Sequence, residues 1–285
     1  MVDLPAFERL LKRDRKITLS GLVILCGLAW LYIAMGAGLN MSVWEMTSFT
    51  LFPHHYTTPP MPDMVGTGMD MMPMAPAAWM AGTWILMVAM WWVMMVAMMT
   101  PSATPAILLY AHAYRHAVAQ GRLSDRVAPT GAFAAGYLLV WLAFSLAAVA
   151  LQWLLEHVGI VSAMTMGSQS RWLSAAVLIA AGMYQFSPLK NVCLSHCRAP
   201  ASFLTRFWRP GALGALRMGI LHGVYCVGCC WMLMALLFVG GIMNLVWIVV
   251  LAGLVLIEKL LPLGKWIGHA VGIILILWGV ATLLI

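Results

Sequence analysis

The sequence predicts an all-α protein, a polytopic transmembrane helical bundle of about seven spans, and two observations support this. Hydrophobic residues make up 63% of the 285-residue chain and charged residues only 9%. Soluble proteins carry about 25% charged residues, so this composition is typical of membrane proteins. The apolar segments are also as long as membrane helices, and they lack the alternation of β-barrel strands. Helices satisfy their own backbone hydrogen bonds in lipid, which favours a helical bundle.

Seven apolar segments are candidates for membrane helices. The expected spans are 18–39, 79–100, 131–155, 172–188, 213–239, 242–257 and 267–285. The first follows a basic stretch and has no small-residue cleavage motif, so we interpret it as a retained anchor. The fourth ends at Ser187-Pro188, where the proline stops or kinks a helix. Only Gly240-Gly241 separates the fifth and sixth, which predicts a tight helical hairpin.

The basic residues predict the orientation of the bundle. With the N-terminus in the cytoplasm, every Lys and Arg except Arg171 lies in, or at the edge of, a cytoplasmic segment. This orientation places the C-terminus on the periplasmic or external side of a bacterial inner membrane. The net charge of +7 therefore reflects the orientation of the chain in the membrane. It predicts contact with the lipid bilayer rather than with nucleic acid.

One long loop, residues 40–78, differs from the other connections within what we expect to be a single integral membrane domain, 1–285. It contains no Lys or Arg, several prolines, His54-His55 and many methionines. Thioether and imidazole ligands suit copper in an oxidising compartment, so this external Met/His-rich loop is a candidate for metal capture. A hydrophobic loop lying on the membrane surface explains the same composition.

The cysteines form the strongest candidate site. Cys193 and Cys197 flank His196 after the fourth span, and Cys226, Cys229 and Cys230 follow His222 in the fifth. At 100° per residue, the histidine and three thiols of the fifth span share an arc of about 100°. Thiolates with imidazole suit Cu(I), Zn(II) or an iron–sulfur cluster. The alternative is close helix packing by a small apolar residue. The candidate metal ligands are Cys193, His196, Cys197, His222, Cys226, Cys229 and Cys230, with His54 and His55 in the external loop.

Other polar and sulfur-bearing residues are less specific. Met87, Met90, Met94 and Met98 follow helical spacing in the second span. This stripe fits either a metal conduit or adaptable core packing, and core packing is the commoner meaning. Glu258-Lys259, at the end of the sixth span, fits a simple interfacial ion pair.

Three stretches resemble a known family. They are residues 90–101 (MWWVMMVAMMTP), 184–198 (YQFSPLKNVCLSHCR) and 226–231 (CVGCCW). They are similar to a bacterial family described as predicted metal-binding integral membrane proteins, over about residues 75–260. The resemblance implies that Cys193, Cys197, Cys226, Cys229 and Cys230 form a site, without naming the ion or a reaction.

Three functions remain open on these grounds. The first is a metal-handling membrane protein, with copper favoured and zinc or iron as alternatives. The second is a membrane redox or electron-transfer subunit that cycles the thiols or holds a redox metal. The third is a structural subunit of a larger membrane complex, in which the external loop contacts another membrane or periplasmic protein. The sequence does not decide whether the protein is an enzyme.

Overall fold

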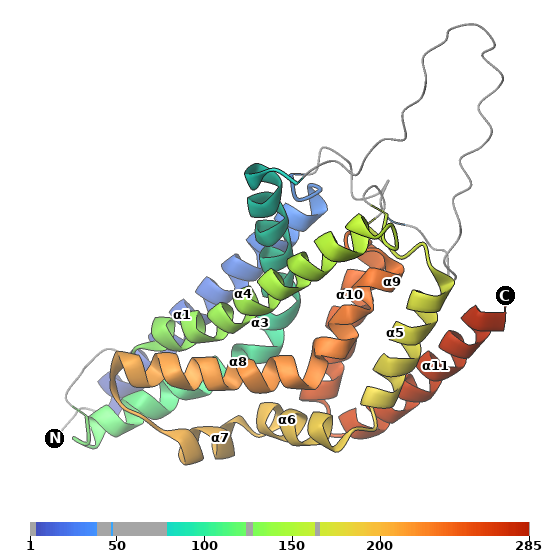
Figure 1. The fold of residues 1–285 in the computed structure, drawn as a ribbon. Coiled ribbons are helices and arrows are strands. Elements are labelled where there is room, and N and C mark those ends of the chain that lie inside the picture. Colours follow the sequence, from blue (N-terminus) through green and yellow to red (C-terminus); the bar gives the residue numbers. More distant parts are fainter. Residues whose placement is uncertain (1–3, 39–46, 48–78, 124–127, 163–165, 285) are drawn as a thin grey trace, which may run out of the picture.

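The computed structural model describes residues 4–38, 47, 79–123, 128–162 and 166–284 (Figure 1). Its helices are α1 (Leu4–Ala34), α3 (Ala81–Ala119), α4 (Thr130–His157), α5 (Arg171–Tyr184), α6 (Pro188–Arg198), α7 (Pro200–Phe207), α8 (Gly211–Ala235), α9 (Leu237–Gly240), α10 (Leu245–Leu260) and α11 (Gly264–Leu284). Within these residues the only β pairing is an isolated antiparallel bridge between Val161 and Ser168. The prediction of an all-α fold is confirmed.

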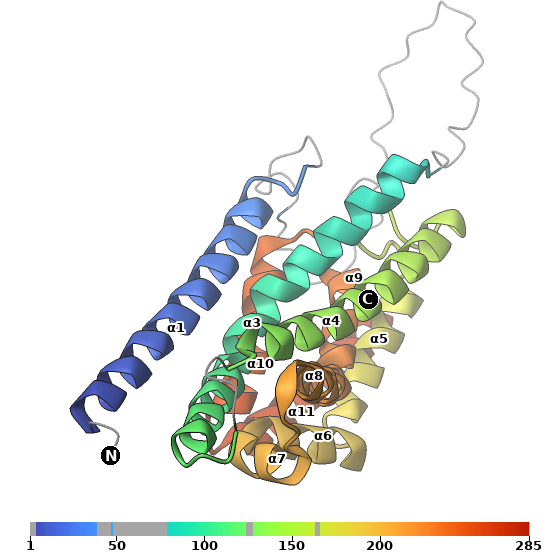
Figure 2. The same cartoon turned by 90° about the vertical axis from the view of Figure 1, so that its left-hand side faces the viewer.

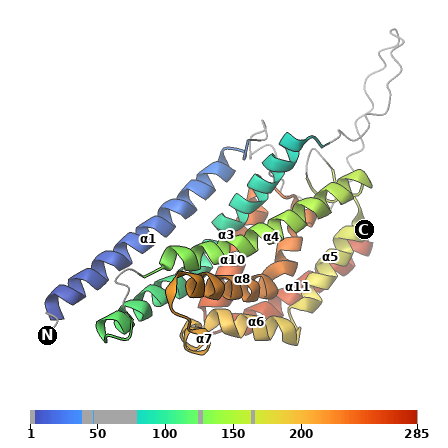
Figure 3. The same ribbon diagram turned by 60° about the vertical axis from the view of Figure 1, so that its left-hand side comes forward.

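The helices pack mainly in neighbouring pairs. α8 packs most extensively on α4, α5 on α11, and α1 on α3. α1 lies at the flank of the bundle beside α3 (Figure 2). α6 and α7 run across one end, below α8, whereas α11 carries the C-terminus towards the other end (Figures 1 and 3). α8 is therefore the helix that meets both α4 and the crossing helix α6.

Several helices are long and apolar enough to cross a membrane. In the described part of the chain five helices meet this condition, and a sixth span results if the bent pair α5–α6 is counted as one. The remaining expected span, 242–257, corresponds to α10, which has 16 residues. A helix of that length extends about 24 Å, less than the roughly 30 Å of a hydrocarbon core. The seven expected spans thus correspond to five long helices, one broken pair and one short helix.

α3 extends beyond the second expected span, because the helix does not stop at Thr100-Pro101. It continues through Pro101 and Pro105 to Ala119. Proline removes one backbone N–H, and at Pro101 this leaves the carbonyl of Ala97 without its helical donor. The thiol of Cys26 on α1 donates to that carbonyl, with a sulfur–oxygen distance of 3.6 Å. A neighbouring helix thus replaces the missing bond, and α3 remains one helix.

The break after α5 agrees with the prediction from Ser187-Pro188. Ser187 caps α6, since its hydroxyl accepts from the backbone N–H of Leu189, and Pro188 occupies the first turn. α6 leaves α5 at an angle of 63°. Because of this bend, α6 does not continue outward but turns across the bundle and packs against α8.

The turn between the fifth and sixth expected spans also lies at the two glycines. Gly241 has a positive φ of 95°, and Asn244 caps α10 by accepting from the backbone N–H of Val246 at 3.1 Å. After this turn, however, α10 packs mainly against α3 and α11, and only slightly against α8. The turn is where the sequence predicts it, but its two helices do not form a closely packed hairpin.

Two glycines allow α4 and α8 to approach closely. A Cβ atom on Gly219 would collide with the backbone of Phe133, and one on Gly136 would collide with the backbone of Leu216 and Ile220. Small residues at such positions let helix backbones touch. This contact sets the position of Tyr137, on α4, relative to the thiols of α8.

Candidate metal centre

α8 holds its predicted ligands on a buried face. The exposed fractions of His222, Cys226, Cys229 and Cys230 are 2%, 1%, 2% and 1%. Their spacing along the helix gives them one common side, as expected from the sequence. The three thiols of α8 therefore lie in the interior, between α8 and the helices that cover it.

The thiols of α6 lie against this face. A Cβ atom on Gly228 would stand 2.7 Å from the sulfur of Cys193, so the absence of a side chain there admits the thiol. Cys197, one turn further along α6, lies near the side chains of Cys226 and Cys229. The structure therefore joins two cysteine groups that are about thirty residues apart in the sequence.

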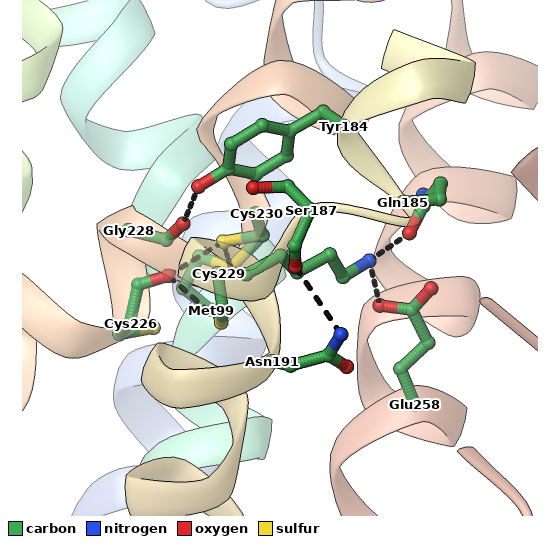
Figure 4. A network of polar contacts seen from close by, with 11 residues as sticks. Met99, Tyr184, Gln185, Ser187, Asn191, Cys226, Gly228, Cys229, Cys230 and Glu258 are labelled. Carbon is green, nitrogen blue, oxygen red and sulfur yellow. Dashed lines mark hydrogen bonds and ion pairs between the residues drawn. The ribbon is translucent and has the colours of Figure 1, made fainter. Parts of the chain in front are cut away.

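The junction that carries α6 is tied to α8 by a hydrogen bond. The hydroxyl of Tyr184, at the end of α5, donates to the carbonyl oxygen of Gly228 (Figure 4). This hydrogen bond and the close contact with the Cys193 sulfur both involve Gly228 of α8. They fix the position of α6 relative to the thiols.

The thiols of α8 are turned toward the backbone of their own helix. The sulfurs of Cys229 and Cys230 lie 3.1 Å and 2.9 Å from the carbonyl oxygen of Cys226, to which they donate (Figure 4). Cys230 also lies 3.9 Å from the thioether of Met99 on α3. The cluster therefore contains thiols and a thioether, which are soft ligands.

A lysine and a tyrosine complete the surroundings of Cys226. The ammonium nitrogen of Lys259, on α10, lies 2.9 Å from the Cys226 sulfur and 3.1 Å from the hydroxyl of Ser102. The hydroxyl of Tyr137 lies 3.1 Å from the same sulfur and 3.1 Å from the carbonyl oxygen of Met99. Lys259 is only 6% exposed. A buried cation beside a thiol favours the thiolate form.

The expectation that Glu258 and Lys259 form an interfacial ion pair is wrong. Glu258 pairs with Lys190 of α6, with 2.7 Å between nitrogen and oxygen, and both side chains are 3% exposed. Gln185 accepts a second hydrogen bond from Lys190 (Figure 4). Adjacent residues on a helix point in different directions, so Glu258 faces α6 and Lys259 faces α8. The sequence offered a signal for both, because charged residues in an apolar helix are functional candidates.

The histidines predicted as metal ligands lie in different surroundings. His222 is buried among the rings of Phe133, Tyr137 and Phe203, and its Nδ1 atom has no hydrogen-bond partner in the described part of the chain. His196 stacks on Tyr225 at 4.2 Å between ring centroids, with its Nδ1 atom 2.9 Å from the carbonyl oxygen of Val192. Stacking on Tyr225 therefore accounts for the position of the His196 ring. His54 and His55 lie outside the described residues.

The side chains that the structure describes are not arranged as a coordination site. Among the described residues, no group of three or more His, Cys, Asp or Glu side chains is arranged to hold a metal ion. All six cysteines are free thiols. Because Cys229 and Cys230 donate to a backbone carbonyl, ligation would require these thiols to rotate away from the α8 backbone.

The methionine stripe is part of the core. Met87, Met90, Met94 and Met98 are at most 7% exposed, and all belong to the main cluster of buried residues. Core packing accounts for this burial. Met99, one residue beyond the stripe, is the methionine that reaches the thiols.

A comparison with protein families gives one match. The family model described as "PpoB2: Copper chaperone" matches residues 88–282, more than half of the chain. No curated protein and no solved structure matches the chain. The matched region contains every thiol of the cluster as well as Lys190, Glu258 and Lys259, and it excludes the loop at 40–78.

Proposed function

The chain belongs to the PpoB2 family of copper chaperones, and from this premise we propose that it binds Cu(I) through Cys197, Cys226 and Cys229 inside a membrane-embedded helical bundle. The observation that carries the proposal is the proximity of Cys197, on α6, to Cys226 and Cys229, on α8. Soft thiolates select Cu(I) over harder ions. Cu(I) is here the cargo of the protein.

The donor set fits Cu(I) better than a structural zinc ion. A structural zinc site needs four ligands in a tetrahedral arrangement. Cys197, Cys226 and Cys229 lie near one another here, and Cys193 and Cys230 are on the same two helices. Cu(I) is satisfied by fewer thiolate ligands than zinc, so this smaller group suffices.

The residues around the thiols supply charge balance and position. Lys259 offsets the negative charge of a Cys226 thiolate before copper arrives. Each copper–sulfur bond formed by a protonated thiol releases that thiol's proton. Tyr137 holds the Cys226 sulfur by a 3.1 Å contact. Met99 adds a neutral thioether beside Cys230, where a weakly held ion can be passed on.

Membrane integration is the second part of the proposal. Five long apolar helices and the bent α5–α6 pair support it. We place the bundle in a bacterial inner membrane with its N-terminus in the cytoplasm, as the distribution of Lys and Arg favours. In this orientation α6 and the thiols lie towards the cytoplasm, and the Met/His-rich loop at 40–78, with His54 and His55, captures copper outside. A membrane or periplasmic protein is then the partner for transfer.

A competition assay tests the copper site. The purified protein is titrated anaerobically with Cu(I) against a chromophoric Cu(I) chelator, and Cys226→Ser and Cys197→Ser are compared with the wild type. Cys26→Ser is the matched control, because it removes a thiol outside the cluster and its hydroxyl still donates to Ala97. We expect the first two variants to lose affinity by at least about tenfold, since each removes one thiolate ligand. Cys26→Ser is expected to bind as the wild type does.

The same preparation separates the alternatives. Equal Cu(I) affinity in the wild type and Cys226→Ser would exclude this site. Elemental analysis that finds zinc or iron in proportion to the intact thiols would replace copper by that metal. Reversible oxidation of Cys226 to a disulfide, without metal binding, would favour the thiol redox alternative.

A further inference from the structure

A groove between α7 and α8 lies apart from the thiol cluster, because no cysteine lines it. It encloses about 430 Å³ and is lined by two arginines, Arg209 and Arg217, together with five apolar side chains. Ligand pockets in proteins typically measure about 300–1,000 Å³. The groove is thus large enough for a small molecule or part of a lipid.

The chain reversal before α8 brings the two arginines together. Gly211 has a positive φ of 78°, which lets the chain turn back on itself at the start of α8. A Cβ atom on Gly214 would stand 2.6 Å from the carbonyl oxygen of Arg209, so the turn is closely packed. The backbone N–H of Arg209 donates to the thioether of Met218 at 3.4 Å. Arg209 is therefore held beside the turn of α8 that carries Arg217.

Among the residues that the structure describes, neither guanidinium has an anionic partner. The sequence contains no Asp or Glu between Glu156 and Glu258. In the described part of the chain, neither side chain makes a hydrogen bond or an ion pair. Arg198 and Arg206 differ, because Arg198 donates to the carbonyls of Leu261 and Pro262, and Arg206 lies over the ring of Phe207. The two arginines therefore present exposed positive charge in the groove that no described side chain compensates.

An apolar strip continues from the arginines along α8. Arg217, Ile220 and Val224 are spaced by three and four residues, so they share one side of the helix. Ile220 and Val224 are 38% and 52% exposed, and both line the groove. The site therefore has a cationic end and an apolar continuation, which is the pattern of an anionic amphiphile.

We propose that this groove binds one anionic phospholipid. Its phosphate is held by Arg209 and Arg217, and an acyl chain lies along Ile220 and Val224. The planar guanidinium donates two parallel hydrogen bonds to phosphate oxygens, which a zwitterionic lipid satisfies less well because its own cation competes. Arg217 lies near the start of α8, where a membrane helix meets the headgroups. This site is independent of the thiols and of copper.

Native mass spectrometry of the purified protein tests the proposal. The protein is equilibrated in detergent with phosphatidylglycerol or with phosphatidylcholine of the same acyl chains, and lipid adducts are counted. We expect the wild type to retain phosphatidylglycerol at least about tenfold more strongly than phosphatidylcholine. Arg209→Gln/Arg217→Gln should lose this preference. Arg122→Gln/Arg171→Gln, which removes the same charge outside the groove, should keep it.

Three results would overturn the proposal. The first is equal retention of the two lipids by the wild type, a measurement that needs no variant. The second is an equal loss of phosphatidylglycerol in the control variant, which would mean general charge attraction. The third is displacement of the lipid by inorganic phosphate at an equal concentration, which would leave the acyl chain without a role. Ile220→Ser/Val224→Ser is expected to weaken phosphatidylglycerol binding, and unchanged binding would count against the apolar strip.

Discussion

The ammonium group of Lys259 and the sulfur of Cys226 lie 2.9 Å apart in the interior of the protein. They come from α10 and α8, and the hydroxyl of Tyr137 on α4 contacts the same sulfur. A buried charge is tolerated only where a partner compensates it. The lysine and the thiolate therefore stabilise one another, and a change to either alters the cluster before any metal binds.

Removing the lysine charge should change the state of the thiol. In Lys259→Met we expect Cys226 to be protonated at neutral pH, because the neighbouring cation is lost. The thiolate absorbance in the ultraviolet, taken as the difference between each protein and its Cys226→Ser counterpart, should disappear. Lys259→Arg keeps the charge and should keep the signal. An unchanged thiolate signal in Lys259→Met would show that the lysine does not compensate the thiol.

The buried ion pair between Lys190 and Glu258 should be essential for stability. Glu258→Gln leaves the Lys190 ammonium without its counter-charge, and breaking such a pair from one side costs about 3–5 kcal/mol. We expect a marked fall in the thermal unfolding temperature in detergent. Lys190→Met/Glu258→Met replaces both charges with apolar side chains and should recover most of the loss. A double variant less stable than the single one would indicate that the charges are favourable in themselves.

The contact between α4 and α8 should not tolerate a methyl group. Gly219→Ala places a Cβ against the backbone of Phe133, which cannot move without displacing α4. Overpacking of this kind costs about 1–3 kcal/mol. Gly253→Ala on α10 is the matched control, since no atom lies within 4 Å of its new Cβ. Thermal unfolding should show a loss for Gly219→Ala and none for Gly253→Ala, and equal behaviour would contradict the close packing.

The thioether of Met99 should contribute to copper handling, unlike the methionines of the core. Met99→Leu removes the sulfur that lies 3.9 Å from Cys230, with little change in volume. We expect faster transfer of Cu(I) from Met99→Leu, or weaker binding to it, in the competition assay, by a few-fold. Met94→Leu is equally buried and should behave as the wild type. A similar change in Cu(I) binding or transfer in both variants would mean that Met94 also contributes to copper handling.

The sequence allowed the α-helical class and the grouping of cysteines to be predicted, because both depend on local pattern. Helix-length apolar segments predict the first, and spacing along one helix places Cys226, Cys229 and Cys230 on one side. Ser187-Pro188 marks the break before α6 for the same reason, since proline acts on its own chain neighbours.

Features that depend on contacts between distant segments were not predictable in this way. α3 continues through Pro101 past the expected span, because the thiol of Cys26, 71 residues before Ala97, donates to the carbonyl that the proline leaves without its helical donor. Glu258 and Lys259 were interpreted as a pair because they are adjacent. In the structure Glu258 pairs with Lys190 of α6, and Lys259 contacts Cys226 of α8. Local rules describe neither contact, because both arise from how separate helices pack.

The ion pair between Lys190 and Glu258 also has a consequence for the order of assembly during translation. The two residues are 68 positions apart, and the lysine is synthesised first. At roughly 5–20 residues per second, Lys190 waits about 3–14 s before its carboxylate partner exists. During that interval α6 cannot settle against α10. The nascent chain must keep this segment hydrated or shielded until the residues of α10 have been made.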